Sequence, residues 1–152
     1  MEITLHSIGS VHSERVDAID DDWDSVGSWI ELDEGIPEES ISGLGDFSHI
    51  EVLYYFNKVD PGKISYGAEH PRENPEWPKV GIFAQRKKSR PNLIGATIVR
   101  LVRLEGKKIY VSGLDAIDGT PVLDIKPVFN EYLPSAPVVQ PVWVTELMKH
   151  YW

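Results

Sequence analysis

The chain has 152 residues, which is enough for one domain with its own hydrophobic core, and its lack of cysteine excludes disulfides, zinc thiolates and a cysteine nucleophile. It shows no secretory leader and no run of about 20 apolar residues, so we expect a cytoplasmic protein without a membrane span. The net charge of −9 by itself disfavours nucleic acid as a partner.

The N-terminal third is predicted to form strands separated by an acidic loop. Residues 2–12 partly alternate apolar and polar side chains, which is typical of one or two short strands. Residues 13–27 are acidic and poor in apolar side chains, so we expect an exposed loop or a poorly ordered segment. A short strand over 29–32 and one helical turn over 37–41 follow. The β-branched and aromatic run over 48–57 is the strongest strand signal.

The rest of the chain alternates turns with further strands. Residues 58–79 contain four prolines and are predicted to form a long irregular loop. Strands are then expected over 80–85, 94–104, 108–114 and 122–128, with a hairpin turn at Glu105-Gly106-Lys107. Short strands with little helix indicate a mainly β barrel or sandwich. We treat residues 1–152 as a single domain whose tail, from about residue 130, carries aromatic side chains that pack on the body or on a partner subunit.

The first segment suited to ligand binding is a predicted strand that runs into four cations over residues 81–92. Arg86 and Arg90 can each make bidentate contacts with a carboxylate or a phosphate. The segment lies in a basic island, since residues 61–110 hold 11 basic and 4 acidic residues. The island predicts either a local positive field or a solvated face that acidic neighbours balance, and the segment itself is alternatively an ordinary basic turn.

The second segment is a glycine- and aspartate-rich turn within residues 111–127. Gly113 and Gly119 permit a tight backbone and the close approach of a ligand. Asp115 and Asp118 can accept from a ribose hydroxyl or face an amine or a sulfonium. The alternative is that both aspartates only shape the turn, as aspartate often does.

Histidine offers one further candidate. His49, at the start of the strongest predicted strand, is a candidate general base, although a lone histidine is more often structural. The other four histidines lack metal-ligand spacing, so no metal site is predicted. No glycine-rich phosphate loop is present, which disfavours a Rossmann fold.

Four strings carry a resemblance to a known family. They are GLGDFSHI at 43–50, VGIFAQR at 80–86, RPNLIG at 90–95 and SGLDAIDGTPVLDIKP at 112–127. Found in this order, they resemble the TrmO-type tRNA methyltransferases, also called TsaA-like. The likeness covers roughly residues 6–130 and is poor over 13–42.

The resemblance implies a single-sheet β-barrel with a few short helices that forms a homodimer and binds S-adenosylmethionine near the dimer interface. It implies methylation of N6 of threonylcarbamoyl-adenosine beside the anticodon, and hence a tRNA partner. Carried over by position, the cofactor-binding residues are Asn57, Arg86, Ala96, Ser112, Gly113, Leu114 and Asp115. The residues expected to meet RNA are Lys87, Lys88, Arg90 and Asn92. The candidate general bases are Asp115, Asp118 and His49.

A non-catalytic module is the alternative function. The Gln-Pro-Gly-like segment with which the family helps to bind its cofactor has no clear equivalent in residues 13–30. The same barrel is then expected to bind S-adenosylmethionine or RNA without chemistry. A hydrolase is disfavoured, because no GxSxG string is present and Ser48 and His49, as strand neighbours, point to opposite faces.

Overall fold

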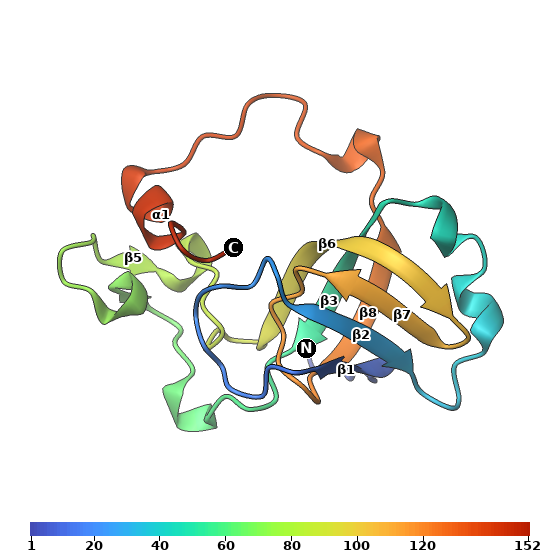
Figure 1. The fold of residues 1–152 in the computed structure, drawn as a ribbon. Helices are drawn as coiled ribbons and strands as arrows, with labels where there is room; N and C mark the ends of the chain where they lie inside the picture. The colour runs from blue at the N-terminus through green and yellow to red at the C-terminus, as the bar shows by residue number, and fades with distance from the viewer.

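Six antiparallel strands close into one barrel in the computed structural model, which describes residues 1–152 (Figure 1). The neighbours around the barrel are β1-β2-β7-β6-β3-β8, and β8 pairs back onto β1. Closure leaves no unpaired sheet edge in the barrel. The prediction of a mainly β barrel with a few short helices is confirmed. The barrel strands are β1 (Gly9–Ser13), β2 (Gly27–Leu32), β3 (His49–Tyr55), β6 (Ile94–Glu105), β7 (Lys108–Ser112) and β8 (Pro121–Pro127).

The core fills the inside of the barrel. Side chains of a strand point alternately to its two faces, and every second residue of β2 and β3 is buried. Each buried aliphatic side chain contributes about 1.5–3 kcal/mol, so this alternation fixes the register of the strands. The inward-facing aliphatic residues that are at most 2% exposed include Val11, Ile30, Ile50, Val52, Val99, Ile109, Val111 and Val122.

Helical structure is confined to short pieces outside the barrel. The turn predicted over 37–41 is a 3-10 helix, Glu38–Ile41, and the only α-helix is α1, Val142–Leu147. No helix combines the length and the apolar character needed to span a membrane. The other 3-10 helices are Leu44–Asp46, Pro61–Lys63, Pro71–Glu73, Ile82–Ala84 and Asn130–Tyr132.

The strand predicted over 80–85 is mostly wrong. Only β5 (Val80–Gly81) is extended, paired with β4 (Ala68–Glu69), and the chain then turns through the 3-10 helix Ile82–Ala84. In this antiparallel register a longer β5 would pair with Gly67 and the residues before it, but only the Ile82 amide bonds there, to the Gly67 carbonyl over 2.8 Å, and Ser65 bonds to Ser89 instead. The apolar residue Ile82 is buried within this turn, where it is 1% exposed, and does not belong to a strand.

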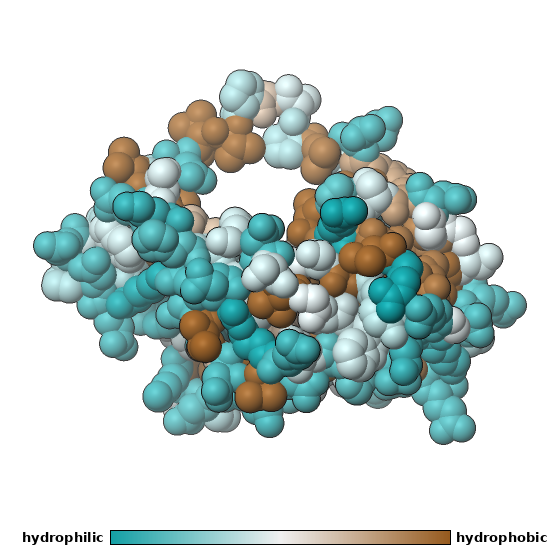
Figure 2. Space-filling model, viewed as in Figure 1, coloured by the Kyte–Doolittle hydropathy of each residue, from teal (hydrophilic) through white to brown (hydrophobic).

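A C-terminal arm, residues 128–152, leaves β8 and returns along the outside of the molecule to α1, close to β4 and β5 (Figure 1). Residues 130–142 are exposed throughout, and an opening separates this stretch from the body (Figure 2). The end of the arm is anchored. The Trp77 indole N–H donates to the Glu146 carboxylate over 2.8 Å, and the amide of Trp23 donates to the carbonyl of Tyr151 over 2.8 Å.

Polar segments gather at one end of the barrel, which we call the site mouth. It is the end where β1, β3 and β7 finish and β2, β6 and β8 begin, as their antiparallel registers require. The turn after β7, the loop before β6 and the end of the C-terminal arm all meet there.

Candidate active site

The carboxylate of Asp115 is the centre of the site mouth. Its Oδ1 accepts a hydrogen bond from the Tyr54 hydroxyl over 2.9 Å and another from the Thr97 hydroxyl. Its Oδ2 accepts a hydrogen bond from the Tyr151 hydroxyl. The three donors come from β3, β6 and the C-terminal arm, so three separate elements fix one carboxylate. We call these four residues the Asp115 cluster.

Tyr54 lies across the inner wall of the barrel. It occupies an inward position of β3 and is 2% exposed. Its ring fits because the facing residue of β6 is Gly95, where a Cβ atom would overlap the ring. Burial, and then the charge of Asp115, raise the pKa of the Tyr54 hydroxyl well above its ordinary value. The hydroxyl therefore stays protonated and donates to the carboxylate.

Arg86 reaches the same place from the loop before β6. A guanidinium N–H of Arg86 donates to the carbonyl of Ala96, the residue next to Thr97. The positive charge of Arg86 also lowers the pKa of the Tyr54 and Tyr151 hydroxyls, although burial and Asp115 outweigh it. The site mouth thus presents one guanidinium and one carboxylate to the same space.

The Arg86 loop is held by its own side chains. The Gln85 amide donates to the carbonyls of Glu69 and Val80, over 3.1 and 3.0 Å. The Arg90 guanidinium donates to the Gln85 carbonyl over 3.0 Å. These bonds tie the loop to both strands of the β4–β5 sheet, so Arg86 extends from a fixed backbone.

The turn after β7 brings backbone close to the cluster. Gly113 has φ 81°, a left-handed conformation that favours glycine, and no atom lies within 4 Å of the position its Cβ would take. Its amide donates to the Val26 carbonyl over 3.3 Å. Leu114 is fully buried in the core, so it anchors the turn while Asp115 faces the mouth.

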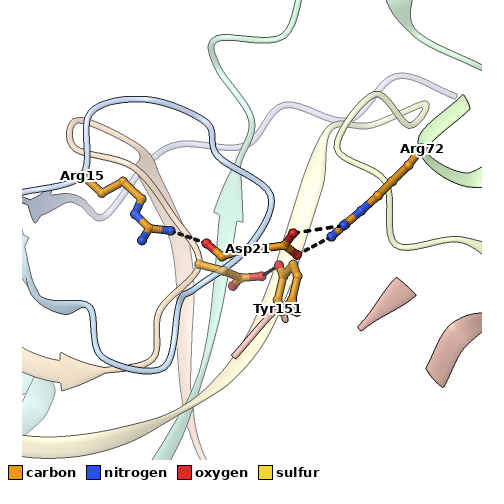
Figure 3. A network of polar contacts seen from close by, with 5 residues as sticks. Arg15, Asp21, Arg72 and Tyr151 are labelled. Carbon is orange, nitrogen blue, oxygen red and sulfur yellow. Dashed lines mark hydrogen bonds and ion pairs between the residues drawn. The ribbon is translucent and has the colours of Figure 1, made fainter. Parts of the chain in front are cut away.

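An acidic loop, residues 14–26, covers one side of the site mouth. The prediction of a loop is confirmed, but Trp23 within it is buried, and the Arg15 guanidinium lies 4.2 Å above its ring. Figure 3 shows Asp21 between Arg15 and Arg72, with Tyr151 close by. Arg15 donates to the Asp21 carbonyl over 2.7 Å, and Arg72 contacts the Asp21 carboxylate over 2.7 and 3.3 Å.

Two surface cavities lie near the site mouth, and neither is lined by Arg86 or by a residue of the Asp115 cluster. One, of about 420 Å³, lies between the acidic loop and the start of β2, next to Gly27, which pairs with Ser112. The other, of about 530 Å³, lies between the first residues of the chain and the strand ends, and it is lined by Tyr55 and Asn92 among others. Both fall within the size range of small-molecule sites.

The structure brings some of the predicted residues together and separates others. Arg86, Ala96 and the turn from Ser112 to Asp115 meet at the site mouth. His49 lies at the other end of β3, where its Nδ1 is 2.7 Å from the Ser48 hydroxyl oxygen. The expectation that these two side chains point to opposite faces is wrong, because Ser48 precedes β3 and strand alternation does not apply to it. The Asp118 carboxylate accepts from the amide of Ser13 over 3.0 Å, which ties the segment between β7 and β8 to the end of β1.

The remaining predicted residues lie around this centre. Asn57 is exposed two residues beyond the end of β3, and Asn92 lines the second cavity. Lys87 pairs with Glu69 over 3.0 Å, whereas Lys88 is exposed and has no ion pair.

Sequence reasoning missed Tyr54, Thr97 and Tyr151 as parts of the site. Tyr54 and Thr97 lie within strong strand patterns and were therefore assigned to the barrel alone. Tyr151 belongs to the aromatic tail, for which only packing was predicted. A signal was available for Tyr54 and Thr97, because a buried hydroxyl needs a hydrogen-bond partner.

Comparison with known proteins identifies the family. Residues 15–133 match the family model of the tRNA-methyltransferase O N-terminal domain. The chain belongs to the TrmO family. The resemblance inferred from the four strings is thereby confirmed.

Curated TrmO relatives come from animals, bacteria and archaea. The human protein named tRNA (adenine(37)-N6)-methyltransferase is 43% identical over 106 residues, covering 70% of this chain and 24% of the relative. The putative S-adenosylmethionine-dependent methyltransferase RcsF of Pseudomonas aeruginosa is 40% identical, covering 66% and 42%. A probable S-adenosyl-L-methionine-binding protein of Pyrococcus abyssi is 38% identical, covering 62% and 48%. The chain thus spans less than half the length of each.

A solved TrmO structure shares the fold. The crystal structure of TrmO from P. aeruginosa has a TM-score of 0.75 and 28% sequence identity with this chain. The match covers 94% of this chain and 62% of that one, so nearly every residue of this chain has a structural counterpart there.

Proposed function

We propose that this chain is an S-adenosylmethionine-dependent tRNA methyltransferase domain that acts on N6 of threonylcarbamoyl-adenosine beside the anticodon. The observation that carries the proposal is the meeting of Arg86 and Asp115 at the site mouth of a TrmO-family barrel. The names of the human and bacterial relatives support the reaction and the cofactor.

The residues at the site mouth fit this cofactor. S-adenosylmethionine carries ribose hydroxyls, an amine and a carboxylate, which need both hydrogen-bond acceptors and donors. Asp115 offers an anionic acceptor, and the exposed Arg86 guanidinium has N–H groups beyond the one that binds Ala96. The open space above Gly113 lets a ligand approach the backbone. When bound, the cofactor supplies an activated sulfonium methyl group.

The chain's part in the reaction is mainly alignment. In the proposed transfer N6 would take the methyl group and lose its proton to solvent water, and the sulfur would keep the electron pair of the broken bond as neutral S-adenosylhomocysteine. Holding donor and acceptor in line can supply about 7–11 kcal/mol of the barrier. Arg86 and Asp115 would bind the cofactor, and Tyr54 and Thr97 would orient the Asp115 carboxylate. Of the three candidate bases only Asp115 lies in the cluster, so the proposal gives no chemical role to His49 or Asp118.

The loop that carries Arg86 is the proposed contact with tRNA. Lys88 is exposed and unpaired, and the half-buried Lys87 and Arg90 lie in the same loop, although Lys87 is already bound to Glu69. We assign to these three cations the phosphates next to the target base, with Asn92 beside them. Because phosphate contacts release counterions, tRNA binding should weaken steeply between 50 and about 200 mM salt.

We further propose that the enzyme works as a cytoplasmic homodimer. The C-terminal arm exposes a run of apolar side chains, including Tyr132 at 87% and Val139 at 93% exposure. Apolar surface of this kind is typical of protein interfaces. Light scattering on the purified chain tests the proposal, and a monomer at micromolar concentration would contradict it.

Label transfer tests the activity. The chain is incubated with methyl-labelled S-adenosylmethionine and with tRNA that carries or lacks threonylcarbamoyl-adenosine. We expect label only in the modified tRNA, and a loss of about tenfold or more in cofactor affinity for Arg86→Ala. Arg103→Ala is the matched control, because that exposed arginine pairs with Glu105 in a different part of β6. Cofactor binding without label transfer to any tRNA would refute the proposal in favour of a non-catalytic module.

A further inference from the structure

We infer that Tyr151, which the C-terminal arm supplies, is a positioning residue of the proposed cofactor site. It holds the Asp115 carboxylate so that a single acceptor position on Oδ2 is presented to the ligand. The inference rests on the proposed function, and it adds the C-terminal arm to the site.

The acceptor positions of the carboxylate lead to this assignment. An ionised carboxylate offers about four of them, two on each oxygen. Oδ1 accepts from Tyr54 and Thr97, which fills it, while Oδ2 accepts from Tyr151 alone. About one position therefore remains, and it lies on the oxygen that Tyr151 holds. The ligand group at that point must be a hydrogen-bond donor, such as a ribose hydroxyl or an amine.

Tyr151 is the only donor of the cluster that does not belong to the barrel. Tyr54 and Thr97 are fixed in β3 and β6. Without the Tyr151 hydroxyl, Oδ2 has no protein donor, so water would take both of its positions and compete with the ligand. The Tyr151 hydroxyl thus leaves Oδ2 with one open position instead of two.

Backbone hydrogen bonds from the acidic loop hold Tyr151 in place. The amides of Asp22 and Trp23 donate to the carbonyls of His150 and Tyr151 over 2.9 and 2.8 Å. The acidic loop that supplies these amides is in turn held by Arg15 and Arg72 (Figure 3). The loop and the arm, which are far apart in the sequence, therefore form one support for the Tyr151 hydroxyl.

The surroundings keep this hydroxyl protonated. Burial, and then the Asp115 charge, raise the pKa of Tyr151. Tyr54 adds to the increase, whereas Arg86 opposes it, and Arg72 is close enough to Tyr151 for their charges to interact. Tyr151 therefore acts as a donor to Asp115 throughout the neutral range, as a positioning residue must.

Calorimetric titration with S-adenosylmethionine tests the inference. Tyr151→Phe removes one hydroxyl and keeps the ring, and Tyr132→Phe makes the same change at an exposed position of the arm. We expect Tyr151→Phe to weaken cofactor binding by about tenfold or more, and Tyr132→Phe to leave it within about twofold. Because Tyr151 acts through Asp115, adding Tyr151→Phe to Asp115→Asn should weaken binding no further.

A second readout is independent of the cofactor. Alkaline titration of phenolate absorbance should show two late-titrating tyrosines, Tyr54 and Tyr151, of which one is lost in Tyr151→Phe, and both should titrate earlier in Asp115→Asn. Unchanged or tighter cofactor binding by Tyr151→Phe would overturn this inference and leave the proposed function standing. A wild-type chain that does not bind S-adenosylmethionine would overturn both.

Discussion

The substitution Gly95→Ala tests whether the barrel wall positions the Asp115 cluster. A Cβ at Gly95 would overlap Cε2 and Cζ of the Tyr54 ring and lie 2.9 Å from Cζ of Phe56. Phe56 packs edge-on against Tyr54, with ring centroids 5.4 Å apart, so the Tyr54 ring cannot move toward it. The ring must then shift and lose its 2.9 Å hydrogen bond to Asp115.

The expected cost follows from these contacts. Overpacking a core costs about 1–3 kcal/mol, and losing a hydrogen bond to a charged group costs about 1.5–3 kcal/mol. Replacing glycine by alanine restricts the unfolded chain and returns about 0.4–1 kcal/mol. The free energy of unfolding should therefore fall by about 2–5 kcal/mol. A loss near 3 kcal/mol corresponds to a decrease of about 6–12 °C in melting temperature for a chain of this length.

Urea unfolding followed by tryptophan fluorescence measures the effect of Gly95→Ala. The matched control is Gly27→Ala, also in a barrel strand, where no atom lies within 4 Å of the added Cβ and no positive φ is required. We expect the control to be neutral or slightly stabilised. Equal unfolding free energies for Gly95→Ala and the wild type would show that the Tyr54 ring has room to move, and the packing argument would be refuted.

Two further predictions concern the protonation of Tyr54 and the attachment of the arm. The raised pKa of Tyr54 means that the unfolded state releases its proton first as the pH rises above about 10, so the free energy of unfolding should fall by about 1.4 kcal/mol per pH unit there. Between pH 9 and about 11, the free energy of unfolding of Tyr54→Phe should fall with pH less steeply than that of the wild type, by that amount. Identical pH dependences of the two proteins would contradict the raised pKa of Tyr54. Arg72→Asn keeps a residue type that tolerates the φ of 49° but removes the half-exposed ion pair with Asp21. We expect about two- to fivefold faster amide exchange at Asp22 and Trp23, measured by NMR, with no change at the centre of β3; equal exchange rates would show that Arg72 does not support the arm.

Local patterns predicted most of the barrel. The β-branched and aromatic run over residues 48–57 predicted β3 to within a few residues, and the strand expected over 94–104 matches β6. The same reasoning failed over 80–85, where the apolar residues fill a 3-10 turn. Periodicity over so few residues cannot distinguish a strand from a buried turn, since the difference lies in the partner that pairs with it.

The site was predictable only in part, for a related reason. Arg86 and Asp115 stood out by the glycine, proline and charge around them, and the structure places both at the site mouth. Tyr54 and Thr97 have the appearance of ordinary strand residues in the sequence. Tyr151 follows a long exposed stretch, and its contacts with the acidic loop join segments that share no local pattern.

The sequence by itself determined the β-rich architecture, the family and two of the charged residues at the mouth, because each of these depends on short-range pattern or on strings that can be read directly. Only the tertiary structure decided which hydroxyls surround Asp115. Tyr54, Thr97 and Tyr151 are 61, 18 and 36 residues away from it along the chain. They meet because barrel closure brings the strand ends to one mouth and because the acidic loop holds the end of the arm against that mouth.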